Sequence, residues 1–305
     1  MRVPDFLTIR DFTTDELLHL LELAREIKKN PAAYSRALAG KTLALIFEKP
    51  SLRTRVSFDV GIHQLGGFSV YLSPAEINLG KRESVFDVAK NLERMVQGIM
   101  IRTFAHDIVE RMAEWANIPV INGLTDFSHP CQAMADFLTM LEHKGRLGGL
   151  KVAYVGDSNN VSNSLMFAAA RFGAHIAIGS PEGYQPKPEV TAWTRAEGAK
   201  TGSTLLVTAD PAEAVAGADV VYTDTWASMG QEAEAHARKL VFRPYQVNRE
   251  LFSKARPDAL FMHCLPAHRG EEVTDEIIDS ANSVVFDEAE NRLHAQKAIM
   301  LAMMR

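Results

Sequence analysis

A short segment near the front of the chain combines positive charge with hydroxyl groups. Ser51-Leu52-Arg53-Thr54-Arg55 directly follows the apolar run 42–47. At the start of a helix such a segment can bind phosphate, because free backbone N–H groups attract anions and arginine adds charged hydrogen bonds of fixed geometry. A solvated helix cap with surface arginines is the alternative, although arginines at a helix start oppose the dipole and need another reason to be there.

A histidine and a glutamine follow a later apolar run, in Ser128-His129-Pro130-Cys131-Gln132. Serine is a favoured N-cap and proline suits the first turn, so this segment is predicted to open a helix. The positive end of that helix should lower the pKa of His129, and a neutral imidazole can donate to a carbonyl oxygen. A structural histidine in a helix cap is the alternative. Arg102, at the end of another apolar run, is by itself an ordinary arginine.

Three polar segments follow apolar runs in the second half of the chain. The first, Gly156–Ser164, stands where a dinucleotide fingerprint would stand, but it lacks G-x-G-x-x-G, which argues against a nicotinamide cofactor. It offers the amides of Asn159 and Asn160 to a polar small molecule instead. The second, Asp224–Gly230, combines an acid, hydroxyls and a glycine turn that can hold an ammonium group.

The third segment, 263–268, reads His-Cys-Leu-Pro-Ala-His and raises the question of zinc. Structural zinc sites have four ligands in recognisable spacings, and here C-x-x-C is missing and only one other cysteine exists. We therefore expect no metal. Cys264 is either a reactive thiol in a binding site or a small buried hydrophobe.

The elements that position these segments alternate between strand and helix. A capping box formed by Thr13 and Glu16 predicts a first helix with one apolar face. Strands are predicted at 42–47, 68–72, 98–102, 119–122, 152–155, 175–178, 204–207, 219–222, 259–262 and 283–286. Helices are predicted at about 55–65, 84–95, 107–116, 129–143 and 288–304. Such alternation indicates parallel sheets with helical crossovers, where ligands bind beyond the carboxyl ends of the strands.

The glycine-rich stretch Lys144–Gly149 is the best domain boundary in the chain. We therefore predict an α/β protein with two parallel-sheet domains, 1–147 and 148–288, and an active site in the cleft between them. The last helix, 289–305, is expected to pack back on the first domain.

Composition sets limits on the partners. The chain has 305 residues, 47% of them hydrophobic, and a net charge of −5, which argues against a nucleic-acid-binding face. Two cysteines cannot form a disulfide framework, so a cytoplasmic location is expected. No run approaches the roughly 20 apolar residues of a membrane span, so no membrane partner is expected either.

The motifs, taken in order from Ser51 to Arg292, resemble those of the carbamoyltransferases, over essentially the whole chain. Residues 51–55 resemble the carbamoyl phosphate loop of the family, and His129-Pro130-Cys131-Gln132 resembles its H-P-x-Q motif. The motifs Asn159-Asn160, Asp224 with Ser228-Met229-Gly230, and His263-Cys264-Leu265-Pro266 resemble the ornithine-type signatures; aspartate-type members lack S-M-G and H-C-L-P.

The resemblance implies transfer of the carbamoyl group of carbamoyl phosphate to the δ-amine of L-ornithine, giving citrulline and phosphate in arginine biosynthesis or catabolism, with no cofactor. The implied carbamoyl phosphate residues are Ser51, Leu52 through its amide, Arg53, Thr54, Arg102, His129, Gln132, Cys264, Leu265 and Arg292. The implied ornithine residues are Asn160, Asp224, Ser228 and Met229, and the resemblance also places Cys264 and the Leu265 carbonyl around the δ-nitrogen of ornithine. The implied catalytic residues are Arg102, His129 and Cys264.

Two positions depart from the family pattern. Leu52 replaces a threonine of the family's loop, which removes a hydroxyl but keeps the backbone N–H. Asn78 stands where the family often has glutamine, in a loop that reaches the site of a neighbouring subunit; the implied assembly is a homotrimer, in some members assembled further.

Three other functions are alternatives: transfer to a carbamoyl acceptor other than ornithine, a catalytically silent regulatory role, and nucleotide-dependent oxidoreduction, which the missing glycine fingerprint disfavours.

Overall fold

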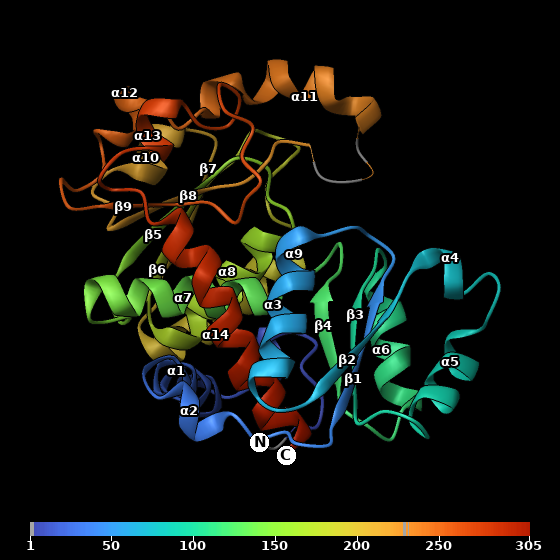
Figure 1. Ribbon diagram of the computed structural model, residues 1–305. Helices are drawn as coiled ribbons and strands as arrows, with labels where there is room; N and C mark the ends of the chain where they lie inside the picture. Colours follow the sequence, from blue (N-terminus) through green and yellow to red (C-terminus); the bar gives the residue numbers. More distant parts are fainter. Residues whose placement is uncertain (1–2, 228–229, 231) are drawn as a thin grey trace. The chain divides into compact units, whose positions relative to one another are not determined.

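The computed structural model describes residues 3–227, 230 and 232–305. The chain divides into two compact units, Met1–Leu138 with Glu290–Arg305, and Thr139–Ala289 (Figure 1). Each unit is built on one parallel sheet, of four and five strands, so the predicted α/β class with two parallel-sheet domains is confirmed. Among the described residues, no helix is both long enough and apolar enough to span a bilayer.

The sheet of the first unit has the order β2-β1-β3-β4 and all its neighbours are parallel. Its strands are β1 (Thr42–Phe47), β2 (Phe68–Leu72), β3 (Gly98–Arg102) and β4 (Val120–Leu124). Its helices are η1 (Ile9–Asp11), α1 (Thr14–Lys29), α2 (Pro31–Tyr34), α3 (Leu52–Gln64), α4 (Pro74–Ile77), α5 (Val85–Leu92), α6 (His106–Trp115), the first part of α7 (Pro130–Lys144) and most of α14 (Val285–Met304). The predicted capping box of α1 is confirmed, since Thr13 and Glu16 bond reciprocally.

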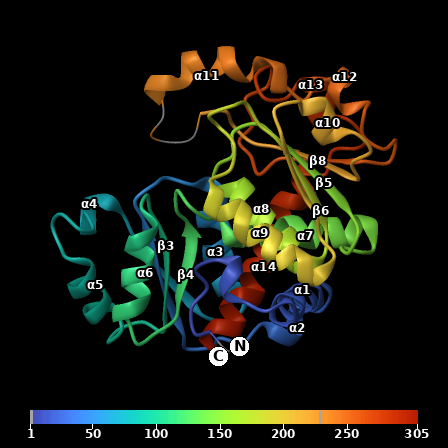
Figure 2. The same ribbon diagram turned by 180° about the vertical axis from the view of Figure 1, so that it is seen from behind.

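Helices cover both faces of this sheet (Figures 1 and 2). On one face α5 and α6 bury Val88 and Met112 against β-strand residues such as Ile99. On the other face α3 lies beside α14, so closely that a Cβ placed on Gly61 would approach the Met300 side chain to 2.9 Å. Burial on both faces explains why β1, β3 and β4 read as largely continuous apolar runs, whereas the edge strand β2 is partly exposed.

The sheet of the second unit has the order β7-β6-β5-β8-β9, again all parallel. Its strands are β5 (Lys151–Val155), β6 (His175–Gly179), β7 (Leu205–Thr208), β8 (Val220–Thr223) and β9 (Leu260–Met262). Its helices are α8 (Asn160–Phe172), α9 (Pro188–Thr201), α10 (Pro211–Val215), η2 (Glu232–Glu234), α11 (Ala235–Phe242), η3 (Arg243–Tyr245), α12 (Arg249–Phe252) and α13 (Asp275–Ile278). Its core joins Val155 and Phe261 of the strands to Phe242 and Ile277.

The predicted strand at 283–286 is wrong. Only Ser283 makes an isolated bridge, to Phe261, and Val285 already begins α14. The run Ser-Val-Val-Phe is apolar enough to suggest a strand, but Asp287 and Glu288 follow it at once and are favourable in the first turn of a helix. The Phe286 side chain is 72% exposed, unlike a strand buried on both faces.

Candidate active site

The topology of the first sheet fixes where its ligand site lies. The chain leaves β1 toward β2 on one side and continues with β3 and β4 on the other, so the winding reverses between β1 and β3. Such switch points open a crevice at the carboxyl ends of the strands. Phe47 and Arg102 pair in register at those ends, which places Arg102 beside the loop that follows β1.

That loop runs into the N-terminus of α3, as the residue types predict. Ser51 is the N-cap and accepts a hydrogen bond from the Thr54 backbone N–H at 3.2 Å. Leu52 is the first residue of α3 and is 73% exposed, so its backbone N–H, and not its side chain, is the group that this residue can contribute at the helix start. The segment can therefore bind an anion through backbone N–H donors and through the Arg53 guanidinium group.

Two arginines converge on the buried hydroxyl of Thr54. Arg292 Nη2, from α14, lies 2.7 Å from Thr54 Oγ1, and Arg102 Nη1 lies 3.4 Å from it. A hydroxyl oxygen has two acceptor sites and one proton to donate. Because guanidinium groups take both acceptor sites, the Thr54 hydroxyl can act toward a further group only as a donor.

His129 lies in the same positive field, immediately before α7. It is buried, and burial together with the charges of Arg292, Arg102 and Arg53 lowers its pKa well below the ordinary value. The predicted direction of the shift is confirmed. The causes are desolvation and three arginines from β3, α3 and α14, which a sequence pattern at one helix start could not reveal.

The same topology recurs in the second sheet. Winding reverses between β5 and β8, and Val155 pairs with Thr223 near the carboxyl ends. The polar segments that follow these two strands, starting at Gly156 and Asp224, therefore lie side by side. The residue types of both segments predict a binding role, but the sequence alone does not reveal that the two segments are neighbours.

Asp224 is the centre of this second cluster. Asn159, the N-cap of α8, donates from Nδ2 to Asp224 Oδ2 at 2.7 Å, and the Cys264 thiol donates to Asp224 Oδ1 at 3.2 Å. The structure thus brings Asp224 and Cys264 together and places Asn160 at the first position of α8. Ser228 and Met229, also predicted to bind ornithine, lie outside the described residues.

The segment that contains Cys264 is held by its neighbour His263. The Leu265 backbone N–H donates to His263 Nδ1 at 2.8 Å, so Nε2 carries the ring proton and donates to Glu272 at 3.1 Å. Leu265 has φ +58° and its peptide bond to Pro266 is cis. Asp224, His263 and Cys264 lie close enough to surround a metal ion. However, both ring nitrogens of His263 are already engaged, so the cluster fits a metal poorly.

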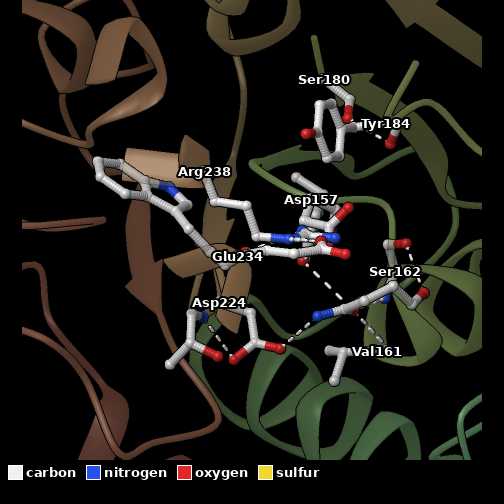
Figure 3. Close-up of polar contacts among 12 residues, drawn as sticks. Asp157, Val161, Ser162, Ser180, Tyr184, Asp224, Glu234 and Arg238 are labelled. Atoms are coloured by element: carbon white, nitrogen blue, oxygen red, sulfur yellow. Dashed lines mark hydrogen bonds and ion pairs between the residues drawn. The ribbon is translucent and has the colours of Figure 1, made fainter. Parts of the chain in front are cut away.

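A buried ion pair that the sequence reasoning missed supports the same cluster (Figure 3). Arg238 of α11 donates from Nη1 to Asp157 Oδ2 at 2.8 Å and to the Trp226 carbonyl at 3.0 Å, and from Nε to Glu234 at 3.1 Å. Burial raises the pKa of Asp157, and the Arg238 charge opposes that rise. The pair ties α11 to the loop that carries Asn159. Only the fold brings residues 157 and 238 together.

The structure also gives the positions of the other residues that the sequence predicts for the site. Gln132 is buried in the first turn of α7, three residues after His129. Cys264 and Leu265, assigned to carbamoyl phosphate, belong to the second unit, with Asp224. Asn78 ends α4 with φ +46° and is exposed.

Two α/β units, each with polar groups at its switch point, define a two-substrate enzyme of the α/β class. Family models agree: residues 4–142 match the carbamoyl-P binding domain, and residues 148–303 the Asp/Orn binding domain, of aspartate/ornithine carbamoyltransferase. The chain belongs to the aspartate/ornithine carbamoyltransferase family.

Relatives and solved structures agree with this membership. The ornithine carbamoyltransferase of Thermococcus kodakarensis is 56% identical over 98% of this chain and 96% of its own. The "ornithine carbamoyltransferase, anabolic" of Pyrococcus furiosus is 52% identical, with the same coverage. The solved structure of the Pyrococcus furiosus protein has a TM-score of 0.96, covering 98% of this chain and 96% of that one. That of Gloeobacter violaceus ornithine carbamoyltransferase has a TM-score of 0.91 at 46% identity, covering 99% of both chains.

Replacing Arg238 with methionine should lower the free energy of unfolding by about 3–5 kcal/mol, because it leaves Asp157 buried without its partner. Denaturant unfolding measures the change. The double variant R238M/D157L should recover much of the loss, since the uncompensated charge is then gone. The matched control is Arg249→Met, which breaks an exposed ion pair with Glu276 and should cost about 1 kcal/mol or less. Equal losses in R238M and R249M would contradict a buried pair.

The ring of His129 should stay neutral in the folded protein at pH values where an ordinary histidine is largely protonated. The unfolded chain binds a proton at this residue below about pH 6.5, so the stability contributed by the neutral ring is complete above that pH and is lost as the pH falls. Nitrogen NMR of histidine-labelled protein, assigned with His129→Gln, measures the protonation state. A ring that titrates near pH 6.5 would refute the lowered pKa.

Proposed function

We propose that this chain transfers the carbamoyl group of carbamoyl phosphate to the δ-amine of L-ornithine, giving L-citrulline and phosphate. The observation that carries the proposal is the buried positive cluster of the first unit, where Arg102 and Arg292 hold the Thr54 hydroxyl beside a neutral His129. A buried cluster of positive charge favours a negatively charged ligand, and carbamoyl phosphate is a doubly negative one.

In this proposal the phosphate group binds at the start of α3. Ser51, the Leu52 amide, Arg53 and Thr54 surround it, and Arg102 contributes from the end of β3. The helix N-terminus and the guanidinium groups favour the dianion that leaves after transfer, so they stabilise the product side of the bond cleavage as well as the bound substrate.

The carbonyl oxygen of the carbamoyl group is assigned to His129, Thr54 and Arg102. A neutral imidazole donates one hydrogen bond without placing another full charge in the cluster. Negative charge grows on this oxygen as the amine attacks, and donors fixed at such an oxygen are each worth about 3–4 kcal/mol of transition-state stabilisation. Gln132 is assigned to the carbamoyl NH₂ group, and Arg292 lies at the same end.

Ornithine is assigned to the second unit. Asn160, Asp224, Ser228 and Met229 hold it, and Cys264 with the Leu265 carbonyl surrounds its δ-nitrogen. The free δ-ammonium has a reference pKa near that of lysine, about 10.4, and a partly apolar site favours its neutral form.

The attacking nitrogen must lose a proton before the new C–N bond is complete. The Cys264 thiol holds its proton in a hydrogen bond to the Asp224 carboxylate. Cys264 is therefore a poor base, and we favour the departing phosphate as the proton acceptor. The C–N bond forms, the C–O bond to phosphate breaks, and the electron pair leaves with the phosphate oxygen.

We propose that the chain forms a homotrimer. Large apolar side chains are exposed on α3 and on the edge strand β2: Leu52, Val56, Val60, Phe68 and Val70. The Phe68 and His63 ring centroids lie 6.3 Å apart, so this apolar face continues from α3 to β2. A second copy of the chain is its proposed cover, and the exposed Asn78 is the residue proposed to reach a neighbour's site.

A cytoplasmic location is part of the proposal. Cys131 and Cys264 are both free thiols, as is usual in a reducing compartment. The citrulline formed belongs to arginine metabolism, in the biosynthetic or the degradative direction.

The purified chain should form citrulline from carbamoyl phosphate and ornithine, and Arg53→Ala should lower the rate by at least about 10²–10³-fold with the fold intact, because the phosphate loses a fixed donor. Arg25→Ala, which breaks only an exposed pair with Glu22, should keep the rate. Colorimetric citrulline detection and circular dichroism measure both effects. Turnover with another amine but not with ornithine would show that the proposed acceptor is wrong. Absence of turnover with any amine would favour a catalytically silent member of the family.

The native protein should have three times the mass of one chain by light scattering. Phe68→Asp should release monomers, because it places a charge on the proposed contact face. Leu240→Asp changes an equally exposed apolar side chain on α11 and should leave the mass unchanged. A native monomer, or a trimer that survives F68D, would contradict the assigned face.

A further inference from the structure

We infer that Asp136 is a positioning residue that sets which way round the amide of Gln132 lies, and that this orientation selects a carbamoyl NH₂ group over a methyl group. The inference deepens the proposed function and rests on its assignment of Gln132 to the carbamoyl group. It adds a residue to which the sequence reasoning gave no role.

The geometry joins the two side chains directly. Gln132 and Asp136 are one turn apart on α7, so they share a face of the helix. Gln132 Nε2 donates to Asp136 Oδ1 at 2.8 Å, and the two residues are 1% and 0% exposed. At this depth a polar contact cannot be exchanged freely for water, so the pair has one arrangement.

The chemistry of the carboxylate decides that arrangement. An ionised Asp136 only accepts hydrogen bonds, whereas an amide has one accepting end and one donating end. In the structure Gln132 Nε2 is the donor and Asp136 Oδ1 the acceptor, which is the arrangement that a carboxylate requires. Gln132 must therefore turn its NH₂ group toward Asp136, which leaves Oε1 as the end that can accept from a ligand.

An accepting oxygen distinguishes two phosphate compounds of nearly the same shape. Carbamoyl phosphate carries an NH₂ group on its carbonyl carbon, and acetyl phosphate carries a methyl group that cannot donate. A neutral side chain at position 136 that can donate as well as accept removes the constraint, because either end of the Gln132 amide can then face it. In the reversed orientation two NH₂ groups meet, which costs the complex a hydrogen bond.

The test compares affinities rather than turnover, so that it does not depend on the acceptor. Calorimetry measures binding of carbamoyl phosphate, acetyl phosphate and inorganic phosphate to the wild-type chain and to Asp136→Asn. We expect carbamoyl phosphate to bind about 10- to 100-fold more weakly to D136N. Acetyl phosphate and inorganic phosphate should change by no more than about twofold. Equal weakening of all three ligands, or unchanged binding of carbamoyl phosphate, would overturn the inference.

A second variant pair separates positioning from a general packing effect. In the Gln132→Met background the amide is gone, so adding D136N should have no further effect on the ratio of carbamoyl to acetyl phosphate affinity. An additive effect of D136N would show that Asp136 does not act through Gln132. If D136N does not fold, Asp136→Ser carries the same expectation, since its hydroxyl also donates and accepts.

Failure of the proposed function gives a different result. If the wild-type chain forms no citrulline but prefers carbamoyl phosphate to acetyl phosphate in an Asp136-dependent way, the inference holds and the proposed acceptor is wrong. If the wild-type chain forms citrulline but its preference does not depend on Asp136, the proposed function holds and the inference is wrong.

Discussion

The reversal of strand order in each parallel sheet is the constraint on which the rest of this structure depends. At a reversal the loops after two neighbouring strands diverge to opposite faces and leave a crevice at the carboxyl ends. In the first sheet the crevice lies after Phe47 and Arg102, and in the second after Val155 and Thr223. Among the described residues, most polar groups that we assign to a substrate follow the carboxyl end of a strand or lie on a helix next to it. The chain therefore needs little more than the correct residue types in a few loops.

The crevices differ in the charge that they bury. The first collects guanidinium groups and keeps its histidine neutral, because burial and repulsion both oppose a further positive charge. The second collects a carboxylate that accepts from an amide and a thiol. A positively charged crevice suits an anionic donor, and a carboxylate suits an amine-bearing acceptor. Binding of oppositely charged substrates therefore explains the charged residues of each unit, which packing alone does not explain.

Most of the fold follows from local sequence signals. Apolar runs of four to six residues predict the strands because the central strands of both sheets are covered on both faces, and Thr13 with Glu16 marks the start of α1 by its own hydrogen bonds. The signal fails at 283–286, where an apolar run belongs to a helix start. Long-range pairs such as Asp157 with Arg238 leave no trace in spacing, since their 81-residue separation is closed only by the fold. Asp136 was missed for another reason: its i, i+4 spacing from Gln132 is plain, but a spacing does not say that both side chains are buried.

The exposed side chain of Leu52 explains how a site can tolerate a change in one of its motif residues. The family's loop usually has threonine at this position. Leu52 begins α3 with its side chain turned to solvent, whereas the bonds that shape the loop are made by its neighbours Ser51 and Thr54. A residue that contributes only a backbone N–H to an anion can change its side chain at little cost to binding. The leucine side chain instead extends the exposed apolar face that α3 forms with Val56 and Val60.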